Sequence, residues 1–198
     1  MPSLCSTVPS VLREMREMCE RYYGDRETVI VEPGVKTGVP VRTDNPKEVG
    51  SDRIMNSLAA VHLYGGPAIV VDFGTSTNFD AVSARGEFVG GALAPGIEIS
   101  VDALSRRAAQ LLKVELTRPP RVIGKNTVES LQSGIIYGFA AQVDGMLTRL
   151  RDELGDEVEA IATGGLAGAI VPFCEMLDDV DPLLTLKGLR IIWQRNQT

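Results

Sequence analysis

A carboxylate, a glycine and three hydroxyl residues stand close together in the segment Asp72-Phe73-Gly74-Thr75-Ser76-Thr77. The apolar run 68–71 precedes it, so Asp72 is expected at the end of a buried strand. A carboxylate in that place is costly unless a cation or hydrogen-bond donors surround it, and such a turn supplies donors of the phosphate-binding kind. The segment is a candidate for holding a metal ion and a phosphate together. The alternative is that Asp72 only accepts hydrogen bonds from the backbone of its own turn.

A second carboxylate suited to catalysis is Asp52, in the segment Gly50-Ser51-Asp52-Arg53 at the expected start of a helix. Transfer of a phosphoryl group to an alcohol benefits from a carboxylate that orients the hydroxyl and accepts its proton. Asp52 has the right chemistry for this role. The alternative is structural, with Asp52 capping the helix and Arg53 acting as a solvated charge.

Three further segments contain glycines that could let the backbone approach a ligand closely. The segment from Gly90 to Gly96 allows backbone to approach a ligand, or it is a bulged strand end. The segment Gly124-Lys125-Asn126-Thr127 precedes a long helix whose free amides suit an anion, although capping by Asn126 explains it equally. The turn Thr163-Gly164-Gly165 follows a predicted strand and is of a type that packs on a nucleotide, a weak signal by itself.

Local patterns predict the helices and strands that must position these segments. Apolar residues at helical spacing predict helices over residues 9–23, 51–64, 97–112, 127–153, 166–173 and 184–195. Strands are predicted over residues 28–31, 68–73, 78–84, 87–92 and 157–162, with turns at Gly34 and elsewhere between the elements. The longest helix has a second face almost without side chains at Gly134, Gly138 and Ala141, which permits another element to approach closely.

The order of these elements predicts an α/β fold with a mixed sheet, a β-meander and crossover helices, because three meandering strands precede alternating helix, strand and helix. Each half of the actin-like, sugar-kinase (ribonuclease H-like) folds is built in this way, which is an analogy.

Composition limits the possible functions. The chain has 198 residues, of which 44% are apolar and 23% charged, and this is ordinary globular usage. A formal charge of -6, with no basic run carrying aromatics, argues against a nucleic-acid partner. The sequence shows neither a bilayer-spanning apolar stretch nor a signal peptide, so we expect a cytoplasmic protein with no membrane partner.

The widely spaced Cys5, Cys19 and Cys174 match no zinc spacing and are expected to be reduced, and His62 is expected to be structural.

The joint occurrence of these motifs, in this order, resembles the type III pantothenate kinases. The resemblance covers nearly the whole chain and is specific as a combination. It is carried by Ser6-Thr7-Val8-Pro9, Asp44-Asn45-Pro46, Glu48-Val49-Gly50-Ser51-Asp52-Arg53, Asp72-Phe73-Gly74-Thr75, Gly90-Gly91 with Pro95-Gly96, Gly124-Lys125-Asn126-Thr127 and Thr163-Gly164-Gly165.

The resemblance implies an enzyme that transfers the γ-phosphate of ATP to pantothenate, the first step toward coenzyme A, as a homodimer that needs a monovalent cation. Mg²⁺ is expected to accompany ATP. Asp52 looks like the general base and Asp72 like the ligand of potassium or ammonium. The substrate-binding positions implied are Gly50, Ser51, Arg53 and Thr127; the ATP-binding positions implied are Gly74, Thr75, Thr163, Gly164 and Gly165. The bare face of the long helix is the candidate dimer surface.

The sequence departs from the family at its beginning, where members carry a strand and an Asp-x-Gly-Asn-Thr loop that grips the ATP phosphates. On this comparison, residues 1–66 are a remnant of the N-terminal ribonuclease H-like half, which is incomplete, and residues 67–198 form the C-terminal half. Weak or absent kinase activity is therefore expected for these 198 residues. Lesser departures are Ser51, where the family usually has Ala, and Thr43, where many members have an aromatic residue. The alternatives are a non-catalytic or regulatory relative of the same fold, and another actin-fold sugar or acetate kinase.

Overall fold

The computed structural model of the protein describes residues 2–6, 8–24, 28–32, 35–107, 114–155 and 157–197. The predicted turn at Gly34 and the predicted helix end at Leu112 lie outside these residues, as does Thr7. The chain forms two compact units. Unit 1 comprises Met1–Ala68, Val82–Gly90 and Leu183–Thr198, and unit 2 comprises Ile69–Ala81 and Gly91–Pro182. The predicted halves, 1–66 and 67–198, divide the chain differently and stay a prediction.

Unit 1 is built on two helices that lie far apart in the sequence, α2 (Ser51–Tyr64) and α6 (Leu184–Arg195). They pack closely together and share an apolar core with neighbouring loops. The buried members of that core are Val31, Val39, Met55, Leu58, Phe88, Ile191 and Ile192. The unit also contains α1 (Pro9–Tyr23), a 3₁₀ turn η1 (Pro46–Glu48), and a parallel pair of short strands, β1 (Ser3–Leu4) and β2 (Val29–Ile30).

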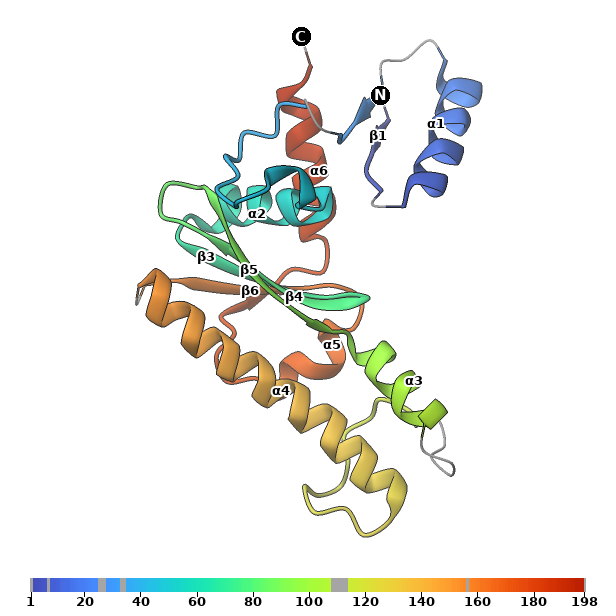
Figure 1. Cartoon of the computed structure of the whole chain (residues 1–198), viewed down its shortest axis with the longest axis vertical. Helices are drawn as coiled ribbons and strands as arrows, with labels where there is room; N and C mark the ends of the chain where they lie inside the picture. The colour runs from blue at the N-terminus through green and yellow to red at the C-terminus, as the bar shows by residue number, and fades with distance from the viewer. Residues whose placement is uncertain are drawn as a thin grey trace. The chain divides into compact units, whose positions relative to one another are not determined.

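The central sheet has five strands in the order β5-β4-β3-β6-β7. Its members are β3 (Ala68–Phe73), β4 (Ser76–Val82), β5 (Phe88–Pro95), β6 (Glu159–Thr163) and β7 (Asp179–Val180). Strands β3, β4 and β5 follow one another as a meander, and their tight turns make neighbours antiparallel, whereas β6 and β7 pair in parallel (Figure 1). The predicted α/β class, with a mixed sheet and a meander, is confirmed.

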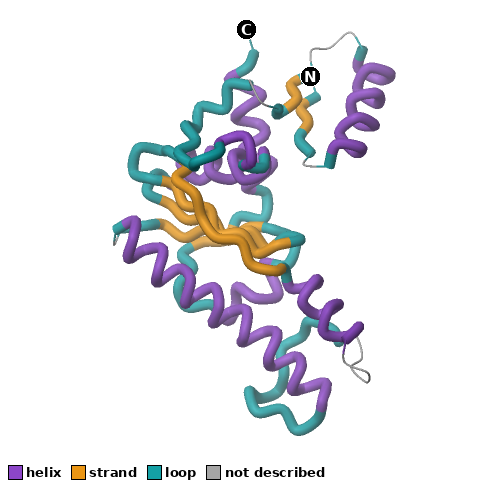
Figure 2. The backbone as a smooth tube through the Cα atoms, in the orientation of Figure 1, coloured by secondary structure: helices purple, strands orange, loops and turns teal. Residues whose placement is uncertain are grey.

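Helices cover one face of this sheet within unit 2. The long α4 (Thr127–Leu154) presents an apolar stripe, including Ile136, Val143 and Leu147, to the alternate residues of β3 that share its core (Figure 2). The helix α3 (Ile97–Arg107), the short α5 (Ala167–Ile170) and the 3₁₀ turn η2 (Val171–Phe173) join the same layer. None of the described helices combines the length and the apolar character needed to cross a bilayer.

The start of α4 is fixed by a reciprocal set of capping hydrogen bonds. The Glu129 N–H donates to Asn126 Oδ1 at 2.9 Å, and the Lys125 N–H donates to a Glu129 carboxylate oxygen at 2.9 Å. A Cβ on Gly124 would lie 2.4 Å from the Ser130 nitrogen, so the preceding loop folds tightly onto the same turn. Capping therefore accounts for Asn126 and Gly124 without a bound anion.

Candidate functional site

In unit 2, two of the segments chosen from the sequence, 72–77 and 163–165, meet at Asp72. Asp72 lies near the end of β3 and is half-buried, as expected. A Cβ on Gly164 would lie 2.6 Å from Asp72 Oδ1 and from the backbone nitrogen and oxygen of Phe73. A Cβ on Gly74 would lie 3.7 Å from the same Asp72 oxygen. The carboxylate is thus bordered by two turns whose backbones approach it because they lack side chains.

The remaining residues of these turns are arranged around that cluster. Thr75 is exposed. A Cβ on Gly96 would lie only 2.2 Å from the carbonyl oxygen of Thr75. The close approach at Gly96 is therefore made to the chain itself. Gly90 and Gly91 lie within β5 and both have positive φ, so whether this segment approaches a ligand or is a bulged strand stays a prediction. Thr163 is buried, whereas Gly165 is exposed and faces open space.

In unit 1, the segment that contains Asp52 forms the first turn of α2. Gly50 is the N-cap residue and provides no side-chain cap, so the turn depends on contacts from elsewhere. Cys5 Sγ and Ser51 Oγ form a hydrogen bond of 3.0 Å, and the Arg53 N–H donates to Asp52 Oδ1 at 3.0 Å. The Arg53 guanidinium lies 5.1 Å from the centre of the Phe88 ring, a cation–π contact that orients it.

A pocket of about 260 Å³ opens beside Asp52 within unit 1. It is lined by Cys5, Ser6, Asp52, Met55, Thr185, Leu186 and Leu189. Asp52 was predicted from the sequence, but the three lining residues from α6 were not. The residue pattern of α6 does not indicate that this helix, far from Asp52 in the sequence, borders a pocket. Cys5 was expected only to be a reduced cysteine, and its place in the pocket also went unpredicted.

Burial raises the pKa of the Cys5 thiol; the hydrogen bond with Ser51 opposes this shift and the nearby charge of Asp52 adds to it. The thiol is therefore neutral at neutral pH and places no second negative charge beside the carboxylate.

Residues 3–149 match the type III pantothenate kinase family. A type III pantothenate kinase of Streptomyces avermitilis is 64% identical over 197 residues, which cover 98% of this chain and 74% of that protein. One from Frankia alni is 66% identical over 194 residues, covering 98% of this chain and 78% of the other. The chain belongs to the type III pantothenate kinase family.

This chain is also similar to a solved structure from Campylobacter jejuni, which is described as a conserved Baf family transcriptional activator. The TM-score is 0.60 at 20% identity, over 92% of this chain and 78% of that one. At that identity the likeness concerns the fold alone.

Thr127, a substrate contact implied for the type III pantothenate kinase family, does not join the Asp72 cluster. It is exposed at the first position of α4, and Figure 1 shows the first turns of that helix, in yellow, extending beyond the sheet. Asp52 and Asp72 belong to different compact units. That they share one pocket stays a prediction.

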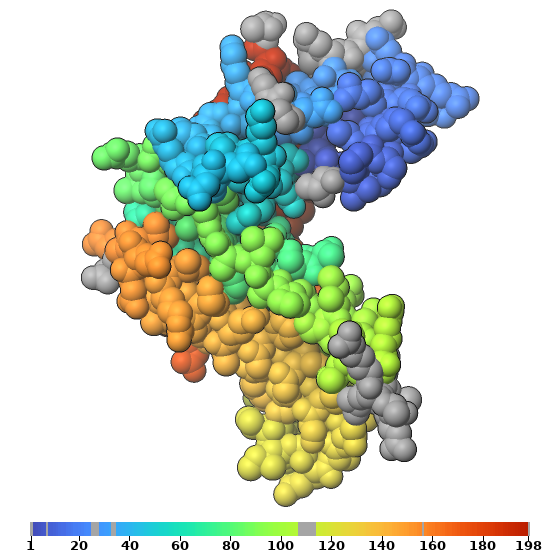
Figure 3. Space-filling model, viewed as in Figure 1, coloured from blue at the N-terminus to red at the C-terminus, as the bar shows by residue number. Residues whose placement is uncertain are grey.

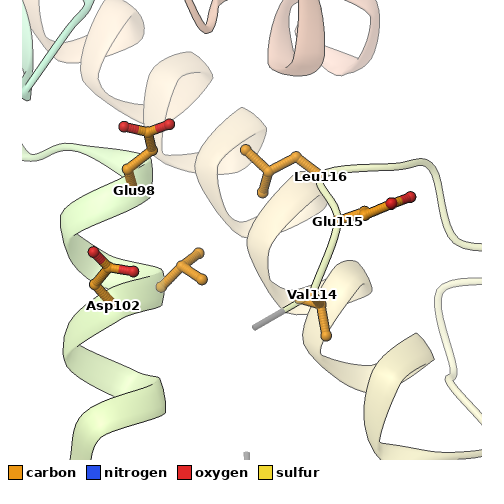
Figure 4. Close-up of a pocket in the computed structure, with 6 residues that line it drawn as sticks. Glu98, Asp102, Val114, Glu115 and Leu116 are labelled. Atoms are coloured by element: carbon orange, nitrogen blue, oxygen red, sulfur yellow. The ribbon is translucent and has the colours of Figure 1, made fainter. Parts of the chain in front are cut away.

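A further pocket in unit 2, of about 400 Å³, contains none of the residues implied by the type III pantothenate kinase family. Figure 4 shows Glu98 and Asp102 on α3 opposite the segment 114–116. Its walls combine three carboxylates with Val101, Val114 and Leu116. Within the described part of the chain, no three His, Cys, Asp or Glu side chains are grouped so as to hold a metal ion.

Proposed function

We propose that this chain phosphorylates pantothenate with ATP, giving 4′-phosphopantothenate for coenzyme A synthesis. The observation that carries the proposal is the match over residues 3–149 and the 64–66% identity to relatives named type III pantothenate kinase. The position of Asp52 on the wall of a pocket supports it, because a general base must be accessible to its alcohol.

The proposed roles in unit 1 concern the alcohol. Asp52 accepts the proton of the pantothenate hydroxyl as that oxygen bonds to the γ-phosphorus of ATP, while the bond from this phosphorus to the β–γ bridging oxygen breaks and ADP leaves. Gly50, Ser51 and Arg53 complete the pantothenate-binding loop, and the cation–π contact with Phe88 holds the Arg53 guanidinium in one direction. The Asp52 oxygen that accepts the Arg53 N–H is fixed, which leaves the carboxylate in a defined orientation.

The proposed roles in unit 2 concern the nucleotide. Gly74, Thr75, Thr163, Gly164 and Gly165 contact ATP, and Mg²⁺ accompanies its phosphates. Asp72 helps to hold potassium or ammonium: its carboxylate and the neighbouring backbone carbonyls are oxygen donors of the kind that hard cations prefer. A bound cation of this kind offsets charge on the phosphates near the turn.

A direct assay tests the proposed reaction. Purified chain is incubated with pantothenate, ATP and Mg²⁺, with and without potassium or ammonium, and product is followed by mass spectrometry. We expect 4′-phosphopantothenate to form only with ATP, and faster with the monovalent cation. Phosphorylation of a sugar or of acetate in place of pantothenate would contradict the proposal. Calorimetric binding of pantothenate without any product would favour the non-catalytic alternative.

We further propose that the chain works as a homodimer in the cytoplasm, with the bare face of α4 at the interface. Gly134, Gly138 and Ala141 are exposed, and a Cβ on either glycine would meet nothing within 4 Å. This helix, yellow to orange in Figure 3, lies at the surface of unit 2. We expect light scattering to report twice the chain mass of 21.3 kDa. A monomer over a wide concentration range would remove this proposal.

A further inference from the structure

The first turn of α2, which carries Asp52, starts at an N-cap residue without a side chain, Gly50. Its first backbone hydrogen bond, from the Ile54 N–H to the Gly50 carbonyl, is long at 3.3 Å, and the Arg53 N–H is bonded only within the turn, to Asp52 Oδ1. Contacts from other parts of unit 1 must therefore hold the turn in place. One such contact is the hydrogen bond between Cys5 and Ser51.

A second contact comes from α6. The Thr185 hydroxyl donates to Asn56 Oδ1 at 2.7 Å, and Asn56 is completely buried. Asn56 is four residues after Asp52 on the same helix, so the two side chains lie on the same face of adjacent turns. Thr185 and Asp52 also line the same pocket.

The backbones of the two helices are held close at the same level. A Cβ on Gly188 would lie 2.1 Å from the carbonyl oxygen of Met55, so α6 approaches α2 at a distance that only glycine allows. The backbone of α6 therefore cannot slide freely along α2, and Thr185 forms its hydrogen bond from this fixed position. Because the bond is short and its acceptor is buried, it opposes rotation of α2 about its own axis.

We propose that Thr185 is a positioning residue for the reaction, which sets the direction of the Asp52 carboxylate through its hydrogen bond to Asn56. This inference rests on the proposed function of Asp52 as the general base. It assigns to the last helix a role in the chemistry that no motif around Asp52 indicates.

The test compares Thr185→Val, which keeps the shape but loses the hydroxyl, with Thr185→Ser, which keeps the hydroxyl. For Thr185→Val we expect kcat to fall about tenfold with an unchanged KM for ATP, because a displaced base slows proton transfer without altering nucleotide binding. Thr185→Ser should restore kcat. Thr148→Val is the matched control, because the Thr148 hydroxyl donates to the Asp144 carbonyl at an exposed position of α4. It should leave kcat unchanged.

A second measurement does not depend on turnover. Hydrogen exchange followed by NMR should show faster exchange of the first-turn amides of α2 in Thr185→Val, with the last turn of α2 and unit 2 unaffected. Equal kcat in Thr185→Val and Thr185→Ser, or a uniform rise in exchange over all of unit 1, would overturn the inference. If the unmodified chain forms no product, the proposed function fails, while the exchange comparison still decides whether Thr185 holds this turn.

Discussion

Asp52→Asn is expected to lower kcat for pantothenate phosphorylation by about 10²–10⁴-fold. In the original chain the Arg53 N–H donates to Asp52 Oδ1 at 3.0 Å. Asparagine keeps the shape of the side chain and an oxygen that can accept this hydrogen bond. The amide does not accept a proton from the substrate hydroxyl, so only the chemical step should suffer. Steady-state kinetics measure the loss, and calorimetry should give an ATP affinity within about twofold of the original.

The control for this substitution is Asp152→Asn, which removes the same charge from an exposed position on α4. It should leave both kcat and ATP affinity unchanged, because a solvated surface charge contributes little. Turnover by Asp52→Asn equal to that of the original chain would reject the role of Asp52 as general base. A parallel loss of ATP affinity would point instead to a role in nucleotide binding.

Gly164→Ala is expected to destabilise the protein by about 2–5 kcal/mol, the sum of backbone strain and overpacking. Gly164 has a φ of 96°, where a residue with a Cβ is strained, and the added carbon would lie 2.6 Å from Asp72 Oδ1 and from two backbone atoms of Phe73. The turn must move away from β3 to accept it. We therefore also expect ATP to bind at least tenfold more weakly, because Asp72 and the turn are displaced together.

Denaturant unfolding and ATP calorimetry check this expectation. Gly168→Ala serves as the control: Gly168 is exposed in α5 and a Cβ there would meet nothing within 4 Å. That variant should be as stable as the original chain or slightly more so. A Gly164→Ala protein with unaltered unfolding and unaltered ATP binding would show that the approach of this turn to Asp72 is not required.

Elements with a strong periodic pattern and clear stop signals could be predicted from the sequence. The bounds of α1, α2, β3 and α6 agree with prediction, and the helix predicted over residues 127–153 ends one residue later. The two-residue strands β1 and β7 were missed. Such short pieces exist because a neighbouring chain segment supplies their hydrogen bonds, and no local pattern records that neighbour.

The candidate site shows the same division. Asp72 and Gly164, both chosen from the sequence, lie side by side because β3 and β6 are neighbours in the sheet and the turn after β6 approaches the end of β3. The roles of these residues stay predictions. The bond from Thr185 to Asn56 joins positions 129 residues apart in the chain. Its existence depends on how α6 packs against α2, which helical periodicity alone does not determine.

The pairing of α2 with α6 also affects the order in which the protein folds during its synthesis. The ribosome releases the residues of α2 early, but Leu184–Arg195 leave the exit tunnel after every other described helix. Unit 2 draws all its residues from positions 69–182, so its sheet and α4 are available for folding while synthesis continues. The first turn of α2, with its aspartate, must wait until residues 184–195 have been synthesised before α6 can hold it in place.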